Sequence, residues 1–206
     1  MVTVSAPLAA RMAEIFMATT SAPMLIYSGA RGKARDSIAT WAHPRVWSNP
    51  SVRITTERLD LVAPGLGTWR ALLEGQVGPA IDGYPTEGDL VRASLVAEGH
   101  LAAGEWGPWQ LIERETSLLV GGAGFKGAPD DEGTVEIGYG LAAAAQGRGL
   151  ATEAVAALVE RAFDRGAVVV RAECDAGNTP SRQVLERAGF ALTEELADVS
   201  WWVRTA

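Results

Sequence analysis

Two glycines and an arginine stand directly before the most regular amphipathic pattern of the chain. Residues 143–163 read AAAQGRGLATEAVAALVERAF, and Gly147, Arg148 and Gly149 precede the periodic apolar positions. The first N–H groups of a helix lack intrahelical partners and carry a partial positive charge, so they attract anions. Glycine leaves those groups accessible because it has no side chain to cover them. The segment therefore predicts a phosphate-binding turn at a helix N-terminus, with Arg148 adding charge at its rim.

The residues after the last glycine limit which phosphate ligand fits this turn. A P-loop requires Lys followed by Ser or Thr at that point, whereas Leu150 and Ala151 follow Gly149, so ATP hydrolysis is disfavoured. A dinucleotide fingerprint requires a third glycine where the chain has Thr152, and it normally follows the first strand of its domain. A nucleotide-dependent oxidoreductase is therefore only a distant alternative.

The same turn fits the pattern Q-x-x-G-x-A through Gln146, Gly149 and Ala151. At this point the chain resembles the GNAT superfamily of acetyl-CoA-dependent N-acetyltransferases. Three further segments follow in the order and spacing of one branch: RITTERLDLVAP at residues 53–64, TVEIGYGL before the turn, and AGNTPSRQVLERAGF at residues 176–190. That branch contains the ribosomal-protein N-terminal acetyltransferases, and the resemblance covers residues 52–206.

The resemblance implies a co-substrate, acetyl-CoA, and a set of residues that bind it. The backbone N–H groups of the turn are expected to hold the CoA pyrophosphate. The strand before the turn and the strand after the following helix are expected to splay into a V that admits pantetheine. Asn178 is expected to touch pantetheine or the substrate backbone, although a simple helix cap explains it equally well. The full cofactor-binding set is Ile137, Gln146, Gly147, Arg148, Gly149, Leu150, Ala151 and Asn178.

Two local features bear on the shape of this V. Gly138 and Gly140 flank Tyr139, and glycines inside a strand fit a β-bulge that would help the strands to separate. Members of the branch often carry a proline and an aromatic residue before the turn, where this chain has only alanines, residues 142–145. We therefore expect a pocket that is roomier or less well fixed at that place.

Acetyl transfer from a thioester by direct attack requires a neutral amine, a polarised carbonyl and a proton for the departing thiolate. By resemblance, Glu136 is the first candidate for the general base, and a solvated or substrate-positioning glutamate is the alternative interpretation. Ser181 and Tyr139 are the candidates for the acid, although a strand tyrosine is more often a packing residue. Glu173 and Asp175 are less favoured bases, because charged strand ends are usually just solvated.

Composition and the remaining chemically active residues narrow the class further. Cys174 is the only cysteine, so an internal disulfide is excluded. A single cysteine in an apolar strand is most often an inert core residue. His43 and His100 lie far apart without a ligand cluster, so no metal is expected. The net charge of −7 argues against general nucleic-acid binding, and no uncharged apolar run approaches the roughly 18 residues of a membrane span. We expect a cytoplasmic monomer or homodimer with no nucleic-acid or membrane partner.

The first fifty residues differ from the remainder in charge and composition. They are net +3, so the remaining residues are net −10, and they are rich in Ser, Ala, Thr and Pro with little apolar periodicity. A weak helical pattern with arginines faintly suggests a transit peptide, but an appended arm or a misplaced start site is favoured. Residues 1–51 are therefore predicted to be a poorly structured or accessory extension, and residues 52–206 the acetyltransferase domain.

The periodicities of residues 52–206 predict one mixed α/β (α+β) domain, and the resemblance implies that this domain is of the GNAT type. Its sheet is expected to be largely antiparallel with one splayed parallel pair, and helices are expected on both faces. The segment after the long helix, residues 167–174, is nearly continuous in apolar residues and predicts a strand covered on both faces. We expect strands at 53–64, 110–115, 116–127, 134–141, 167–174 and 199–204, and helices at 67–75, 87–102, 150–165 and 178–188.

The resemblance therefore implies an acyltransferase that moves the acetyl group of acetyl-CoA to a primary amine. A protein N-terminus is the leading acceptor, and small amines or amino sugars follow. The alternative from another class is a catalytically silent CoA-binding module that acts as a sensor or in an assembly.

Overall fold

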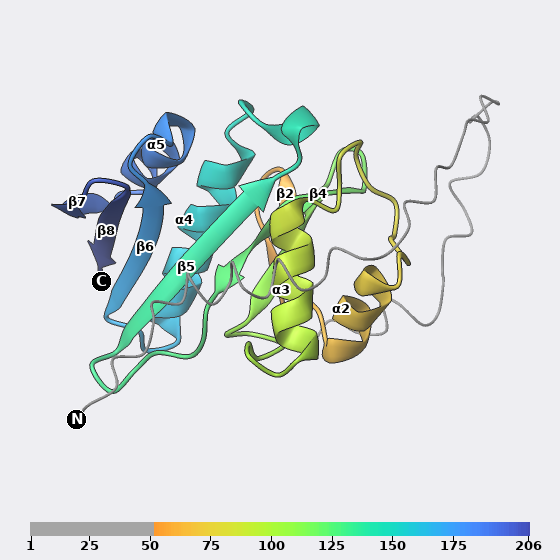
Figure 1. Ribbon diagram of the computed structural model, residues 1–206, viewed down its shortest axis with the longest axis horizontal. Helices are drawn as coiled ribbons and strands as arrows, with labels where there is room; N and C mark the ends of the chain where they lie inside the picture. Colours follow the sequence, from red (N-terminus) through yellow and green to blue (C-terminus); the bar gives the residue numbers. More distant parts are fainter. Residues whose placement is uncertain (1–51) are drawn as a thin grey trace. The chain divides into compact units, whose positions relative to one another are not determined.

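Short segments with alternating apolar residues build one sheet of eight strands in the order β1-β2-β3-β4-β5-β6-β8-β7 (Figure 1). Only β5 and β6 run parallel, and every other neighbouring pair is antiparallel. This computed structural model describes residues 52–206, so our expectations for residues 1–51 lie outside the described residues. The strands are β1 (Val52–Thr55), β2 (Leu59–Ala63), β3 (Pro108–Glu113), β4 (Leu118–Phe125), β5 (Thr134–Leu141), β6 (Val169–Asp175), β7 (Ala191–Glu195) and β8 (Val199–Thr205).

Helices cover both faces of the sheet, as predicted. Figure 1 shows α3 in front of β4 and α4 behind β5, on the opposite side. None of the helices within residues 52–206 is long and apolar enough to cross a membrane. The helices are α2 (Leu66–Leu73), α3 (Glu87–Ala97), the 3-10 turn η1 (Ala143–Ala145), α4 (Leu150–Asp164) and α5 (Thr179–Arg187).

The single strand predicted over residues 53–64 is wrong, because the chain folds there into a hairpin of β1 and β2. Thr56 N–H donates to the carbonyl of Leu59 at 2.9 Å and closes the turn. The guanidinium of Arg114, which follows β3, donates to the carbonyls of Thr56 and Glu57 at 3.0 and 2.9 Å. A residue far along the chain thus fixes this turn, which local alternation does not reveal.

Helix α3 buries a carboxylate. Its apolar residue Leu90 is exposed, whereas Asp89 is 1% exposed. Asp89 forms a capping box with Thr86 and an ion pair with Arg92 at 2.6 Å. It lies against β4 at Gly122, where an added Cβ would come within 2.6 Å of Asp89 Oδ1. The bare glycine therefore decides which face of α3 packs on the sheet.

The core lies between the sheet and α4, whose apolar stripe was predicted correctly. Val155, Leu158, Val159 and Ala162 are completely buried, against residues that include Leu61 and Trp109 from the sheet. Burying such side chains contributes roughly 1.5–3 kcal/mol each for the larger ones, so this face holds α4 firmly in place. The start of α4 therefore has a fixed position relative to β5.

Strand β6 alternates in burial, so the expectation of two covered faces is wrong. Val170, Ala172 and Cys174 point inward, whereas the intervening residues from Arg171 to Asp175 are exposed. The helices α2 and α3 lie over the other half of the sheet and do not reach β6 (Figure 1). No helix of residues 52–206 therefore covers that face of the parallel pair.

The parallel pair separates before either strand ends, as expected. Pairing runs from Thr134 opposite Val169 to Ile137 opposite Ala172, whereas β5 continues to Leu141 and β6 to Asp175. The bulge predicted at Gly138 and Gly140 is absent, because the register between β4 and β5 is continuous. A register shift lies instead between β3 and β4, near Leu111.

Candidate active site

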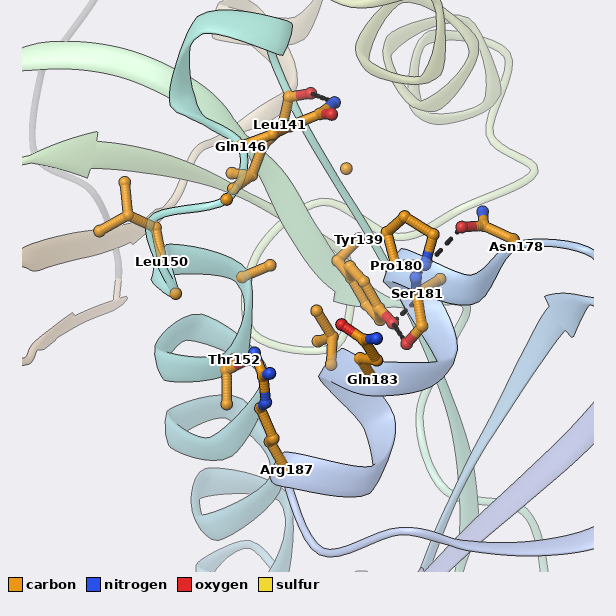
Figure 2. Close-up of a pocket in the computed structure, with 15 residues that line it drawn as sticks. Tyr139, Leu141, Gln146, Leu150, Thr152, Asn178, Pro180, Ser181, Gln183 and Arg187 are labelled. Carbon is orange, nitrogen blue, oxygen red and sulfur yellow. Dashed lines mark hydrogen bonds between the residues drawn. The ribbon is translucent and has the colours of Figure 1, made fainter.

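A pocket of about 400 Å³ occupies the gap between β5 and the helices α4 and α5 (Figure 2). The end of β5, the turn before α4 and one side of α5 form its wall. Of the residues predicted to bind the cofactor or to act in catalysis, the structure brings eight to this wall: Tyr139, Gln146, Gly147, Gly149, Leu150, Ala151, Asn178 and Ser181.

The turn offers the bare backbone that the sequence predicted. Gly147 and Gly149 have φ angles of 71° and 78°, in the left-handed region that glycine adopts without steric cost. Gly149 is the N-cap of α4 and provides no side-chain cap. Within residues 52–206, the backbone N–H groups of residues 147–152 have no acceptor. Six donors at a helix N-terminus are therefore available to an anion.

Gln146 braces this turn against the strand before it. Its Nε2 donates to the carbonyl of Leu141 at 3.0 Å, which ties the last residue of β5 to the first residue of the turn. A backbone carbonyl at a strand end needs such a partner when no neighbouring strand supplies one. The glutamine therefore fixes the wall of the pocket and leaves the N–H groups free.

Arg148 contributes its backbone to the turn, but its side chain points elsewhere. The guanidinium makes an ion pair with Glu113 at the end of β3, a buried carboxylate, and Arg148 does not line the pocket. The carbonyl of Arg148 accepts a hydrogen bond of 2.7 Å from Arg58 Nη1. The side chain therefore anchors the turn to the sheet and does not supply charge at the rim.

A second clamp holds the N-terminus of α4. Glu153 accepts hydrogen bonds from Thr56 Oγ1 at 2.6 Å, from the Arg58 N–H at 2.8 Å and from Arg58 Nε at 2.6 Å. Burial disfavours the ionised carboxylate, but the bonds from Thr56 and Arg58 outweigh burial and hold the pKa of Glu153 below its usual range. The β1–β2 turn and the glycine turn are thus joined through one carboxylate and one guanidinium.

Tyr139 and Ser181 meet at the other side of the pocket (Figure 2). The Tyr139 hydroxyl lies 2.9 Å from the Ser181 carbonyl oxygen and 2.7 Å from Ser181 Oγ. Asn178 caps α5 by accepting from the Ser181 N–H at 3.1 Å, so the cap interpretation of Asn178 holds while the residue also lines the pocket. Burial raises the pKa of Tyr139 to about 12, so this hydroxyl stays protonated at neutral pH.

Glu136 does not join these residues. It points to the opposite face of β5 from Tyr139, as strand alternation requires, and its carboxylate pairs with Lys126 and with Arg171, the latter at 3.1 Å. Ile137, another residue of the predicted set, is 1% exposed and packs in the core at the last paired position of β5. Neither residue lines the pocket.

Seven pocket residues lay outside the set of site residues predicted from the sequence: Gly140, Leu141, Thr152, Pro180, Gln183, Val184 and Arg187. Three of them follow a helical spacing on α5, at positions 183, 184 and 187, so they share one face with Pro180. That spacing was visible in the sequence, but it is equally typical of an ordinary exposed helix face. The clamp residues Arg58 and Glu153 had no local signal, because they lie 95 residues apart.

No group of three or more His, Cys, Asp or Glu side chains within residues 52–206 is placed to hold a metal ion. The pocket instead combines backbone donors, hydroxyls and one arginine. Such a set can bind an anionic ligand and donate hydrogen bonds to a developing negative charge.

Comparison with known proteins defines the class. A family model described as the acetyltransferase (GNAT) domain matches residues 81–191, which is more than half of the chain. The chain therefore belongs to the GNAT acetyltransferase domain family.

Individual relatives agree with this assignment. The N-acetyltransferase YjdG of Bacillus subtilis (strain 168), itself uncharacterized, is 32% identical over 96 residues, which are 46% of this chain and 57% of that protein. The chain thus spans little more than half the length of this relative.

Solved structures share the fold. A GNAT-family acetyltransferase from Bacillus anthracis has a TM-score of 0.55 and 23% identity over 75% of this chain and 98% of that one. RimL, a ribosomal L7/L12 alpha-N-protein acetyltransferase in complex with coenzyme A, has a TM-score of 0.54 and 20% identity over 75% of this chain and 98% of that one.

The clamp at the start of α4 yields a stability prediction. Glu153→Gln is expected to lower the free energy of unfolding at pH 7 by about 1–2 kcal/mol, because hydrogen bonds to a charged acceptor weaken. The pKa of Glu153 is depressed in the folded state, so its stabilisation is present above the ordinary value of 4.5 and is lost as the pH falls through the folded-state pKa. Urea unfolding at several pH values measures this difference.

Glu160→Gln is the matched control on the same helix. Its carboxylate is 63% exposed and pairs with Arg204 at the surface, where an ion pair contributes about 0–1 kcal/mol. A deficit for Glu153→Gln that persists unchanged at acid pH contradicts the ionic clamp.

Proposed function

We propose that this protein transfers the acetyl group of acetyl-CoA to a primary amine by direct attack. The observation that carries the proposal is the run of unpaired N–H groups at residues 147–152, in the turn that lines the pocket beside the unpaired end of β5. Pyrophosphate is an anion that such a run of amides binds well, and family membership supplies the chemistry of the donor. Neither feature alone leads to this function.

The free edge of β5 offers a path for the pantetheine arm. Lys126 N–H donates to the Glu136 carbonyl at 2.9 Å, and Ala142 N–H donates to the Val120 carbonyl at 3.0 Å. Because a strand directs alternate residues to opposite neighbours, the N–H and C=O of Tyr139 face the gap. The amide groups of pantetheine are well suited to pair with that edge, as a neighbouring strand would. The thioester then comes near Tyr139 and Ser181.

Hydrogen bonding, and not complete proton transfer, is the role that fits these two hydroxyls. A thiol has an ordinary pKa of about 8.5, whereas burial raises the pKa of Tyr139 to about 12. Donation of the whole proton to the thiolate is therefore uphill. Ser181 Oγ–H can turn from Tyr139 to the sulfur and stabilise its charge, while Tyr139 holds the serine in place.

The surroundings of Glu136 favour an acceptor amine with a low pKa, which loses its proton without a general base. Both carboxylate oxygens are already paired with cations, Oε1 with Lys126 and Oε2 with Arg171. A protein α-amine has a pKa of about 7.7–8.0, whereas a lysine side chain has one of about 10.4. A substantial fraction of α-amine is therefore neutral at pH 7.5 without any base. We propose α-amines, such as a protein N-terminus, as the acceptor class.

The same pairing of Glu136 also favours the second candidate, a CoA-binding module without catalysis. No carboxylate lines the pocket, and the carboxylate of Glu136 is ion-paired with Lys126 and Arg171. The two candidates differ in turnover, because only the enzyme releases CoA thiol when an amine is added.

The acyl donor is tested at Gly149. Gly149→Val places a β-branched residue at a φ of 78° and covers the N–H groups, so affinity for acetyl-CoA is expected to fall by at least about 100-fold. Calorimetric titration measures the affinity, and thermal unfolding measures the cost to the fold. Gly75→Val, at a φ of 75° outside the pocket, carries the same backbone strain as a control. Equal affinity in wild type and Gly149→Val removes the pyrophosphate from this turn.

The acceptor class is tested with paired peptides. One peptide has a free N-terminus and no lysine, and the other has a blocked N-terminus and one lysine. The neutral fractions of the two amines differ by roughly 100-fold or more near pH 7.5, so the free N-terminus is expected to react at least about 100 times faster. Mass spectrometry locates the acetyl group, and release of CoA thiol gives the rate. Comparable rates contradict the α-amine proposal, and binding without turnover across the panel favours the module.

The two hydroxyls are tested by a double-mutant cycle. Ser181→Ala is expected to lower kcat by about tenfold to 100-fold with little change in KM for acetyl-CoA, because it removes a donor to the departing sulfur. If Tyr139 acts by holding Ser181, Tyr139→Phe adds little once Ser181 is alanine. Strictly additive losses from the two substitutions show instead that Tyr139 contacts the sulfur independently.

A further inference from the structure

One end of the pocket gathers three polar side chains that have no partner in the described part of the chain. Thr152 lies on the first turn of α4, and Gln183 and Arg187 lie on the facing side of α5. In Figure 2 the Arg187 side chain extends from the last turn of α5 toward Thr152. Gln183 and Arg187 are exposed and Thr152 is half-buried, so their polar groups are available to a ligand atom that accepts hydrogen bonds.

Arg187 differs in this respect from nearly every other cation of the domain. Among residues 52–206, the side chains of Arg187 and Arg70 alone among the lysines and arginines make no ion pair or hydrogen bond. Arg70 lies on α2, outside the pocket. Arg187 is therefore the uncompensated positive charge of the pocket wall.

The pocket wall is positively charged, whereas the whole chain has a net negative charge. The whole protein carries −7, yet no aspartate or glutamate lines the pocket, and Arg187 is its one charged lining residue. A cation without a carboxylate nearby is available to an anionic ligand group.

The position of Arg187 separates it from the two features already described. Ser181 lies six positions earlier on α5, or about 9 Å along the helix axis, so Arg187 is remote from the reacting end. The amides of the turn provide neutral donors for one anionic group, and Arg187 provides a charged fork for a second. Coenzyme A carries two such groups, the pyrophosphate and the phosphate on the ribose 3′ oxygen.

We propose that Arg187, assisted by Thr152 and Gln183, binds the 3′-phosphate of CoA and makes the site selective for CoA over dephosphorylated forms. This inference rests on the proposed function. The dianionic phosphate accepts two parallel hydrogen bonds from the guanidinium, which is the geometry that arginine matches best. Removing that phosphate leaves the pyrophosphate and pantetheine contacts unchanged.

The test compares CoA with 3′-dephospho-CoA by calorimetric titration of the full chain. Wild type is expected to bind CoA about tenfold tighter than dephospho-CoA. Arg187→Gln is expected to lose about tenfold in CoA affinity and none in dephospho-CoA affinity, so that the preference disappears. Arg187→Lys is expected to keep part of the preference, since the charge remains without the fork.

Arg70→Gln is the matched control, because it removes another unpaired exposed arginine and is expected to leave both affinities unchanged. Competition by adenosine 3′,5′-bisphosphate against acetyl-CoA gives a second measurement, and Arg187→Gln is expected to weaken it relative to 5′-ADP. A wild type without preference, or equal losses for both ligands in Arg187→Gln, overturns the inference while CoA binding stands. Failure of wild type to bind either ligand overturns the proposed function itself.

Discussion

The end of pairing between β5 and β6 is the constraint on which the other features depend. Beyond Ile137 and Ala172 the two strands continue without each other, so backbone groups in the middle of a sheet lose their neighbours. Buried or half-buried peptide groups need partners, and an unpaired strand edge readily accepts an extended chain. A linear ligand with amide groups, such as the pantetheine arm proposed above, would satisfy that need.

Such an opening is useful only if its rim keeps its shape, and long-range polar contacts provide this. Gln146 holds the end of β5, Arg148 ties the turn to the sheet, and Arg58 with Glu153 joins the turn to the first hairpin. None of these side chains is among the hydrogen-bond donors available to an anion, which are backbone N–H groups. The backbone N–H groups of the turn therefore stay free, while the side chains behind them hold the turn in position.

The sequence revealed those parts of the molecule whose cause is local. The glycine turn, the buried stripe of α4 and the cap at Asn178 follow from residue types at short spacing, and the structure places them as expected. The hairpin of β1 and β2, the burial of Asp89 and the pairing of Glu136 depend on Arg114, Gly122 and Lys126 from other elements. The spacing of apolar residues along the sequence does not show which residues of other elements will be such partners. The ion pair of Arg148 was missed for the same reason, since its partner, Glu113, lies on β3, which is separated from the turn by β4 and β5.

Gly138 and Gly140 give the two faces of β5 different chemical characters. On one face Tyr139 is enclosed by the pocket and tied to Ser181, whereas on the other an added Cβ at either glycine meets nothing within 4 Å. A molecule that approaches the gap from that side meets peptide backbone and open space. Side chains can therefore be added to this side over evolutionary time with little effect on the opposite face. Under the function proposed above, acceptor preference is free to diverge among relatives while the proposed donor site stays the same.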